Sequence, residues 1–226
     1  MERKQEQQKI VFLEGEKVIL RPLNKATDLQ NCVRWMNDPE VLQFLSRVNP
    51  VSFMEEEEWF DNLANRHDDI LLAIETKEGR FIGVLGLHNI DRVNRTAIHG
   101  ISIGEKDYWG KGYGTDAGMV LLNFAFNSLN LRKVRSSVIA LNKRSLNYHL
   151  KCGYKEIGRA REQFFTNGSY WDEILLGVFK EEWEKTRQKM ADYADDVETL
   201  QDGYYERCVE SPSLESSGPK IKSKSW

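Results

Sequence analysis

The most informative stretch of this chain is Tyr108-Trp109-Gly110-Lys111-Gly112-Tyr113-Gly114-Thr115-Asp116-Ala117. An alternating apolar run, Thr96 to Ile103, precedes it, and an apolar segment of helical period, Gly118 to Leu129, follows it. This order predicts a strand, a glycine loop and a helix. Glycines let backbone N–H groups turn inward where a Cβ would block them, and a helix start adds unpaired N–H groups and the positive end of a dipole. The stretch therefore predicts a site at which the main chain binds a phosphate or pyrophosphate.

Two common types of phosphate site fit this spacing poorly. No Gly-Lys-Ser/Thr triplet closes the loop, as a P-loop requires. A dinucleotide-binding loop is typically followed by an acidic residue about 20 residues further on. In this chain the corresponding region, Leu129 to Val138, is basic. A glycine turn without a ligand is the structural alternative, since short glycine motifs also occur in that role.

The residues around the loop resemble a known family. Ile103 to Thr115 is similar to the coenzyme A signature of the GNAT N-acetyltransferase superfamily, Gln/Arg-x-x-Gly-x-Gly/Ala, with Trp109 where Gln or Arg is usual. The aromatic variant resembles the RimJ/RimL-type branch. The similarity runs in family order over residues 15 to 183, through Val18–Leu23, Trp35–Val41, Phe81–Leu87, Asn142–Ser145, Lys151–Tyr154 and Trp171–Glu173.

Composition limits the class of protein. The chain has 226 residues, of which 40% are hydrophobic and 30% charged, enough for one domain with a core plus an extension. The net charge of −3 gives no overall attraction to nucleic acid. The N-terminus lacks an apolar signal core, and no apolar run approaches the length of a membrane span. We therefore expect no nucleic-acid or membrane partner.

The cysteines indicate the compartment. Cys32, Cys152 and Cys208 are far apart, and neither they nor the four histidines show metal-ligand spacing. Reduced thiols in a cytoplasm are the simple interpretation. We therefore expect a cytoplasmic enzyme without a metal site.

Periodicity predicts an α+β fold. Strands are predicted at 17–23, 70–76, 80–90, 96–103, 133–140, 154–164 and 170–179, with Asn167-Gly168 as a hairpin turn. Helices are predicted at 28–36, from Asp38-Pro39, from Ser52 to about Arg66, after the glycine loop to Asn130, and at 143–152. The expected result is a GNAT-like mixed, mostly antiparallel sheet with helices on both faces.

The extent of the resemblance and a change of composition near Arg187 divide the chain into three parts. Residues 1–14 form an N-terminal extension, 15–186 the N-acetyltransferase domain, and 187–226 a C-terminal tail. Within the tail, Met190 to Leu200 predicts a marginal helix, and Ser211 to Ser225 is rich in Ser, Pro, Gly and Lys and is expected to be unstructured. A solvated tail is the expected role, and a partner contact, such as one across a homodimer, is the alternative.

The resemblance implies acetyl-CoA as co-substrate. In the family, pantetheine lies beside the strand before the glycine loop, main-chain N–H groups there polarise the thioester carbonyl, and one stripe of a later helix faces the coenzyme. The residues so implied as acetyl-CoA ligands are Ile101, Ser102, Ile103, Trp109, Gly110, Lys111, Gly112, Tyr113, Gly114, Thr115, Asn142 and Ser145.

The chain departs from the family at the group that protonates the leaving thiolate. In the family this is a tyrosine four residues before the glycine of Lys-x-Gly-Phe/Tyr, and here that position is His149. Tyr148 lies one residue away, about 100° around the helix. His149 shares a helical stripe with Asn142 and Ser145. Donation by His149, by Tyr148 after a register change, or by water stays open.

A second departure concerns the general base. Members of this branch often carry a glutamate near the start of the strand before the loop, where this chain has Ile98 followed by His99. His99 is a candidate base because histidine titrates near neutral pH, although lone strand histidines are often structural. Asp172 and Glu173 are further candidates. Gly100 either marks a bulge or is a plain strand glycine.

Acetyl transfer to a primary amine by direct attack in a ternary complex is the predicted function. The acceptor is a small molecule or a peptide: a protein N-terminus, a polyamine or an amino sugar. The Glu55–Glu58 run suits a polyamine but equally suits the dipole of a helix start. Trp35, Trp59, Trp109 and Trp171 could line a pocket or belong to the core. The alternative function is a coenzyme A-binding sensor or scaffold with little catalysis.

Overall fold

A computed structural model describes residues 10–45, 47 and 49–192. The chain divides into two compact units, Met1–Arg187 and Gln188–Trp226. The sheet and the candidate site belong to the first unit. In the second, the described residues 188–192 are helical, and the predictions for 193–226 lie outside the described residues. The domain boundary near residue 186 stays a prediction.

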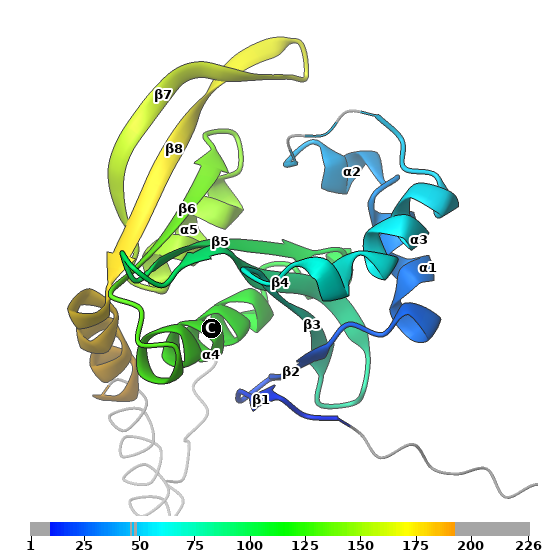
Figure 1. Ribbon diagram of the computed structural model, residues 1–226. Coiled ribbons are helices and arrows are strands. Elements are labelled where there is room, and N and C mark those ends of the chain that lie inside the picture. The colour runs from blue at the N-terminus through cyan, green and yellow to red at the C-terminus, as the bar shows by residue number, and fades with distance from the viewer. Residues whose placement is uncertain (1–9, 46, 48, 193–226) are drawn as a thin grey trace, which may run out of the picture. The chain divides into compact units, whose positions relative to one another are not determined.

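One sheet of eight strands runs through the described residues of the first unit. The strands are β1 (Leu13–Glu14), β2 (Val18–Pro22), β3 (Ile70–Thr76), β4 (Phe81–Asp91), β5 (Thr96–Ile103), β6 (Lys133–Ile139), β7 (Lys155–Thr166) and β8 (Ser169–Phe179). In space their order is β1-β2-β3-β4-β5-β6-β8-β7 (Figure 1). Neighbouring strands are antiparallel except β5 and β6, which are parallel. The predicted α+β fold with a mixed, mostly antiparallel sheet is confirmed.

The labelled α-helices are α1 (Lys25–Trp35), α2 (Pro39–Leu42), α3 (Phe53–Asp61), α4 (Tyr113–Asn123) and α5 (Lys143–Lys151). Each of them except α4 begins at a side-chain cap. Asp38 caps α2, and Ser52 and Glu55 form the predicted capping box of α3. After β8, residues 180–187 are also helical.

The core lies on both faces of the sheet. Leu72 and Ile74 of β3 pack in the same apolar cluster as Leu121 of α4, whereas Ala73 between them packs in the cluster of α1 and α3. This follows from the alternation of side chains along a strand. Trp183, from the helical residues after β8, is fully buried on the α4 side. Helices therefore cover both faces, as predicted.

Three boundaries differ from the sequence predictions. α1 begins at Lys25 because Asn24 is its cap, and Asp28 is instead a buried partner of Arg21. α3 ends at Asp61 and a short 3₁₀ turn follows. The helix after the glycine loop continues from Asn123 as a π-helical turn over 124–128 rather than reaching Asn130.

The sequence leaves two options for Gly100, a bulge or a plain strand glycine, and the bulge is contradicted in the pairing of β5 with β4. Gly100 stands directly opposite Gly86 in an unbroken register, and the irregularity between the two strands lies between His88 and Asp91. Gly100 is therefore a plain strand glycine in this ladder.

The sheet opens between its two parallel strands. β5 and β6 pair only from Thr96–Lys133 to Ile98–Arg135. At the fork, the Ser136 hydroxyl donates to the His99 carbonyl at 3.0 Å. Both strands then continue apart, so the main-chain groups of β5 that point away from β4 have no strand ladder on that side. Such groups need other partners, which a ligand can supply.

Candidate active site

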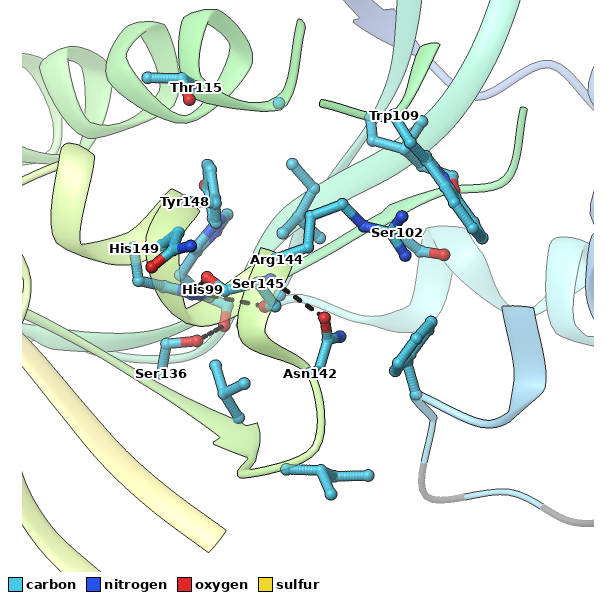
Figure 2. A pocket seen from close by; sticks show the side chains of 18 of the residues that line it. His99, Ser102, Trp109, Thr115, Ser136, Asn142, Arg144, Ser145, Tyr148 and His149 are labelled. Atoms are coloured by element: carbon cyan, nitrogen blue, oxygen red, sulfur yellow. Dashed lines mark hydrogen bonds between the residues drawn. The ribbon is translucent and has the colours of Figure 1, made fainter. Parts of the chain in front are cut away.

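A pocket of about 630 Å³ occupies the fork of the sheet. Its walls come from β5, the glycine loop, the start of α4, β6 and α5, with Phe44 and Phe164 at its margins. Figure 2 shows the polar side chains of these elements gathered around one space. The predicted site residues that line it are His99, Ile101, Ser102, Ile103, Trp109, Gly110, Gly112, Gly114, Thr115, Asn142, Ser145, Tyr148 and His149. Lys111 and Tyr113 are not among its described lining residues.

The glycine loop forms a cradle of main-chain groups. Gly110 and Gly112 have φ of 72° and 88°, a left-handed conformation that favours glycine. Gly112 is the N-cap of α4 and has no side chain to bond the first-turn N–H groups. An added Cβ at Gly110 would meet no described atom within 4 Å, so the outer side of the loop is open. The loop therefore offers N–H groups to an anion at a helix N-terminus.

Asp116 ties the start of α4 to the first strands. Its carboxylate accepts main-chain hydrogen bonds from Glu16, Lys17 and Val18 at 3.1, 2.8 and 3.0 Å. These bonds hold the glycine loop against β2. Sequence reasoning missed this role, because about 100 residues separate the partners and no local pattern marks the pair.

An aromatic stack with one cation stands at the edge of the pocket. The Trp109 indole donates to the Ile103 carbonyl at 2.6 Å, and the Arg144 guanidinium lies 3.7 Å from the centre of the same ring system. Phe44 lies edge-on to Trp109 at 6.4 Å, and Arg144 lies 5.3 Å from its ring. Burial lowers the pKa of Arg144. Sequence reasoning singled out Trp109 but missed Arg144 and Phe44, which come from other elements.

His149 lines the pocket and keeps one ring nitrogen without a partner among the described residues. Its Nδ1 donates to the Ser145 carbonyl at 2.8 Å, because a carbonyl can only accept. Its Nε2 is buried and has no hydrogen-bond partner among the described residues. Burial lowers the pKa of His149 to about 4. Near neutral pH the ring is therefore neutral, and Nε2 carries a lone pair rather than a proton.

Tyr148 and His99 are joined by a hydrogen bond. The His99 Nδ1 donates to the Gly86 carbonyl at 3.1 Å, so Nε2 accepts the Tyr148 hydroxyl proton at 2.7 Å. Burial lowers the pKa of His99 to about 3 and raises the pKa of Tyr148 well above its usual range. Gly118 of α4 makes room for the Tyr148 ring. Both ring nitrogens of His99 are thus in use, which favours a structural tie between β4, β5 and α5.

The remaining candidates lie outside the pocket. Asp172 accepts the Glu162 N–H at 3.0 Å and pairs with Arg159 at 3.3 Å on the outer hairpin. Trp35 is buried and donates to Glu105 at 3.0 Å. Of the four tryptophans singled out from the sequence, Trp109 is the one among the described lining residues. No group of three or more His, Cys, Asp or Glu in the described part of the chain could hold a metal ion.

A family comparison agrees with the arrangement of these elements. Residues 17–155 match the model of the Acetyltransferase (GNAT) domain, which is more than half of the chain. The chain belongs to the GNAT acetyltransferase family. It is an acetyl-CoA-dependent N-acetyltransferase.

Individual relatives support the same class. The chain is 29% identical to the prophage-derived N-acetyltransferase YokL of Bacillus subtilis, over 65% of this chain and 82% of YokL. It is 27% identical to the spermidine N(1)-acetyltransferase of Escherichia coli strain K12, over 74% of this chain and 88% of that enzyme. Among solved structures, spermidine N-acetyltransferase from Vibrio cholerae in complex with CoA and spermine matches with a TM-score of 0.68 and 25% identity. That match covers 74% of this chain and 97% of the other.

The site fits the coenzyme of this family. The open cradle at Gly110 and Gly112 suits a pyrophosphate, and the unpaired edge of β5 suits an extended pantetheine arm with amide groups. Within residues 10–45 and 49–192, no helix is long and apolar enough to cross a membrane.

Proposed function

We propose that this GNAT enzyme, of the RimJ/RimL-type branch, acetylates a primary amine by direct attack within one ternary complex. One observation carries the proposal: a single pocket is lined by the glycine loop, the strand edge of β5 beyond its pairing with β6, and the aromatic side chains Phe44 and Phe164. Donor and acceptor can therefore meet in one cavity, which gives the gain of proximity. The cytoplasmic location and the homodimer expected from the sequence stay predictions.

The two cysteines within the described residues support direct attack over an acetyl-enzyme. Cys32 and Cys152 are buried, and burial raises the pKa of each thiol to about 12. Neither lines the pocket. A thiol held in this state is a poor nucleophile, so the acetyl group moves straight from the thioester to the amine.

His149 is proposed to carry the proton that the leaving thiolate takes up. His149 lines the pocket from the helix position that the family uses for this step, and its buried Nε2 has no hydrogen-bond partner among the described residues. Since Nε2 is unprotonated near neutral pH, it first accepts the proton that the attacking nitrogen loses and then passes it to the thiolate. Tyr148 is a weaker candidate, because its proton is engaged by His99.

His149→Ala is expected to lower kcat by about tenfold or more, with little change in acetyl-CoA affinity, because the group acts in the transition state. His149→Tyr, which restores the family residue, should keep most activity. Steady-state rates of CoA thiol release and calorimetry with acetyl-CoA measure both quantities. Full activity in His149→Ala together with a loss in Tyr148→Phe would assign the step to Tyr148, and full activity in both would leave it to water.

The acceptor is proposed to be a peptide-like amine rather than a polyamine. None of the described residues that line the pocket is Asp or Glu, whereas Arg144 and Lys151 are basic. A polyamine brings further cationic amines into the site, and these need carboxylate partners once they leave water. A peptide N-terminus can instead place its first side chain against Phe44 and Phe164.

A panel of amines tests this acceptor class. Short peptides with a free N-terminus and no basic side chain should show kcat/KM at least about tenfold above spermidine, since each 1.4 kcal/mol of unmatched charge is a factor of ten. The measurement is the initial rate of CoA thiol release. Equal or faster turnover of spermidine would contradict the proposed acceptor. Tight acetyl-CoA binding without turnover of any amine would favour the sensor or scaffold alternative.

A further inference from the structure

The strand next to β5 carries a histidine opposite the position where the resemblance expects a base. Ile98 stands at that position, and its direct partner across the antiparallel ladder is His88 of β4. Directly opposed residues point to the same face of a sheet. His88 thus occupies nearly the same place, on the same face, as a side chain at residue 98. Sequence reasoning did not single it out.

His88 is held by a carboxylate. Its Nδ1 lies 3.2 Å from the Asp69 Oδ2, and the Asp69 Oδ1 accepts the Asn89 N–H at 3.0 Å. Asp69 comes from the residues just before β3, and Arg66 lies 3.7 Å from it. The bond from the Asn89 N–H fixes the Asp69 carboxylate. Because a carboxylate can only accept, the His88 Nδ1 carries the proton and the His88 Nε2 carries the lone pair. This is the pairing that orients imidazole bases.

His88 is not itself among the described residues that line the pocket, but its Nε2 lies next to Gly100, which does line it. His88 shares its face of the sheet with Gly100 and Ser102, both of which line the pocket. A Cβ at Gly100 would stand 3.4 Å from the His88 Nε2, in contact but without collision. Because residue 100 is glycine, no side chain separates that nitrogen from the strand edge. The His88 side chain is 33% exposed, so solvent reaches it.

His88 and His99 differ in what they can do. His99 points to the opposite face of β5, is buried, and uses both ring nitrogens. His88 uses Nδ1 on Asp69, and its Nε2 has no hydrogen-bond partner within the part of the chain that the structure describes. A proton acceptor must have a free lone pair within reach of the substrate, directly or through one water. Of these two histidines, the geometry favours His88.

We propose that His88, oriented by Asp69, takes the proton from the acceptor's ammonium group. This inference rests on the proposed transfer to an amine. The ammonium gives one proton to the His88 Nε2, directly or through one water, and the neutral amine then attacks the thioester carbon. The C–N bond forms and the C–S bond breaks. The second proton of the attacking nitrogen goes to the thiolate, and His88 releases the first to solvent.

The charged groups around His88 are few and can be named. Asp69 faces its ring, Arg66 lies beyond Asp69, and the buried His99 lies across β5. Arg135 of β6 stands in register with Ile98 on the same face, two strands from His88. The pair with Asp69 is the shortest of these contacts.

His88→Gln tests the proposal. With an alkylamine acceptor near neutral pH, kcat/KM should fall about 100-fold, the usual contribution of a general base. The deficit should shrink at alkaline pH, where the amine loses its own proton. It should nearly vanish with a weakly basic arylamine, which is neutral at the start. Asp69→Asn should show the same pattern, because its amide favours the wrong tautomer of His88. His67→Gln, an exposed histidine of the same loop, is the control and should be unchanged.

The outcomes separate the two proposals. Acetyl-CoA affinity and melting temperature confirm that each variant is folded. A further variant, Gly100→Ala, covers the His88 Nε2 with a methyl group and leaves His88 and His99 unchanged. A loss in His88→Gln that is the same at every pH and with every acceptor would overturn the inference, as would full activity. Wild-type enzyme inactive toward all amines would overturn the proposed function and this inference together.

Discussion

Gly112→Val is expected to weaken acetyl-CoA binding about 100-fold or more, because main-chain N–H bonds to a charged group contribute about 1.5–3 kcal/mol each and two would be lost. Gly112 has φ of 88° and caps α4. A β-branched residue avoids this conformation, so the loop must turn and its N–H groups leave the cradle. The nearest described atom to an added Cβ is the Lys17 side chain at 3.7 Å, so the fold itself has room.

Gly168→Val is the matched control. Gly168 also has a left-handed φ, 74°, at the tip of the β7–β8 hairpin, and an added Cβ there meets no described atom within 4 Å. Gly168→Val should introduce similar backbone strain without any loss of acetyl-CoA affinity. Isothermal calorimetry with acetyl-CoA measures the binding, and thermal melts measure the strain. An unchanged dissociation constant in folded Gly112→Val would remove the glycine loop from the pyrophosphate site.

Local signals in the sequence were enough for most of the fold. The capping box of Ser52 and Glu55 starts α3 where predicted. Asn167 and Gly168 take the positive φ values, 52° and 74°, that their hairpin turn requires. Such features depend on neighbours in the sequence, so a pattern of a few residues specifies them. β1, a strand of two residues, has no comparable pattern and was missed.

The chemistry of the site depends on contacts between distant residues. The helical stripe predicts that His149 faces the coenzyme, and the structure places it in the pocket wall. The same stripe does not reveal that Tyr148 bonds His99, which is 49 residues away on β5. Likewise, His88 meets Asp69 only because β3 and β4 are antiparallel and their register pairs Ile70 with Leu87. Register follows from the whole sheet, so a single sequence does not show these pairs.

Asp28→Ala is expected to lower the free energy of unfolding by about 3–5 kcal/mol, the usual cost of removing one partner from a buried ion pair. The Asp28 side chain is fully buried and accepts bonds from the Arg21 Nη1 at 2.7 Å, the Arg21 Nη2 at 2.9 Å and the Asn24 N–H at 2.8 Å. Arg21 also pairs with Glu75 at 2.6 Å. Hydrogen bonds and charge from Asp28, and then from Glu75, raise the pKa of Arg21.

The reason for so large an effect is the position of this network between β2, β3 and α1. Without Asp28, the Arg21 side chain, which is 13% exposed, loses two of the four hydrogen bonds that it donates, and the first turn of α1 loses the bond to the Asn24 N–H. Lys25→Ala is the control on the same helix: Lys25 pairs with Asp61 and Glu57 at the surface, where solvent screens the charges, so stability should hardly change. Urea unfolding measures both variants. Since the glycine loop lies elsewhere, acetyl-CoA affinity of the folded Asp28→Ala protein should stay at the wild-type value. A loss of stability no larger than that of Lys25→Ala would mean that water replaces Asp28 at Arg21, and that α1 is held by its apolar contacts alone.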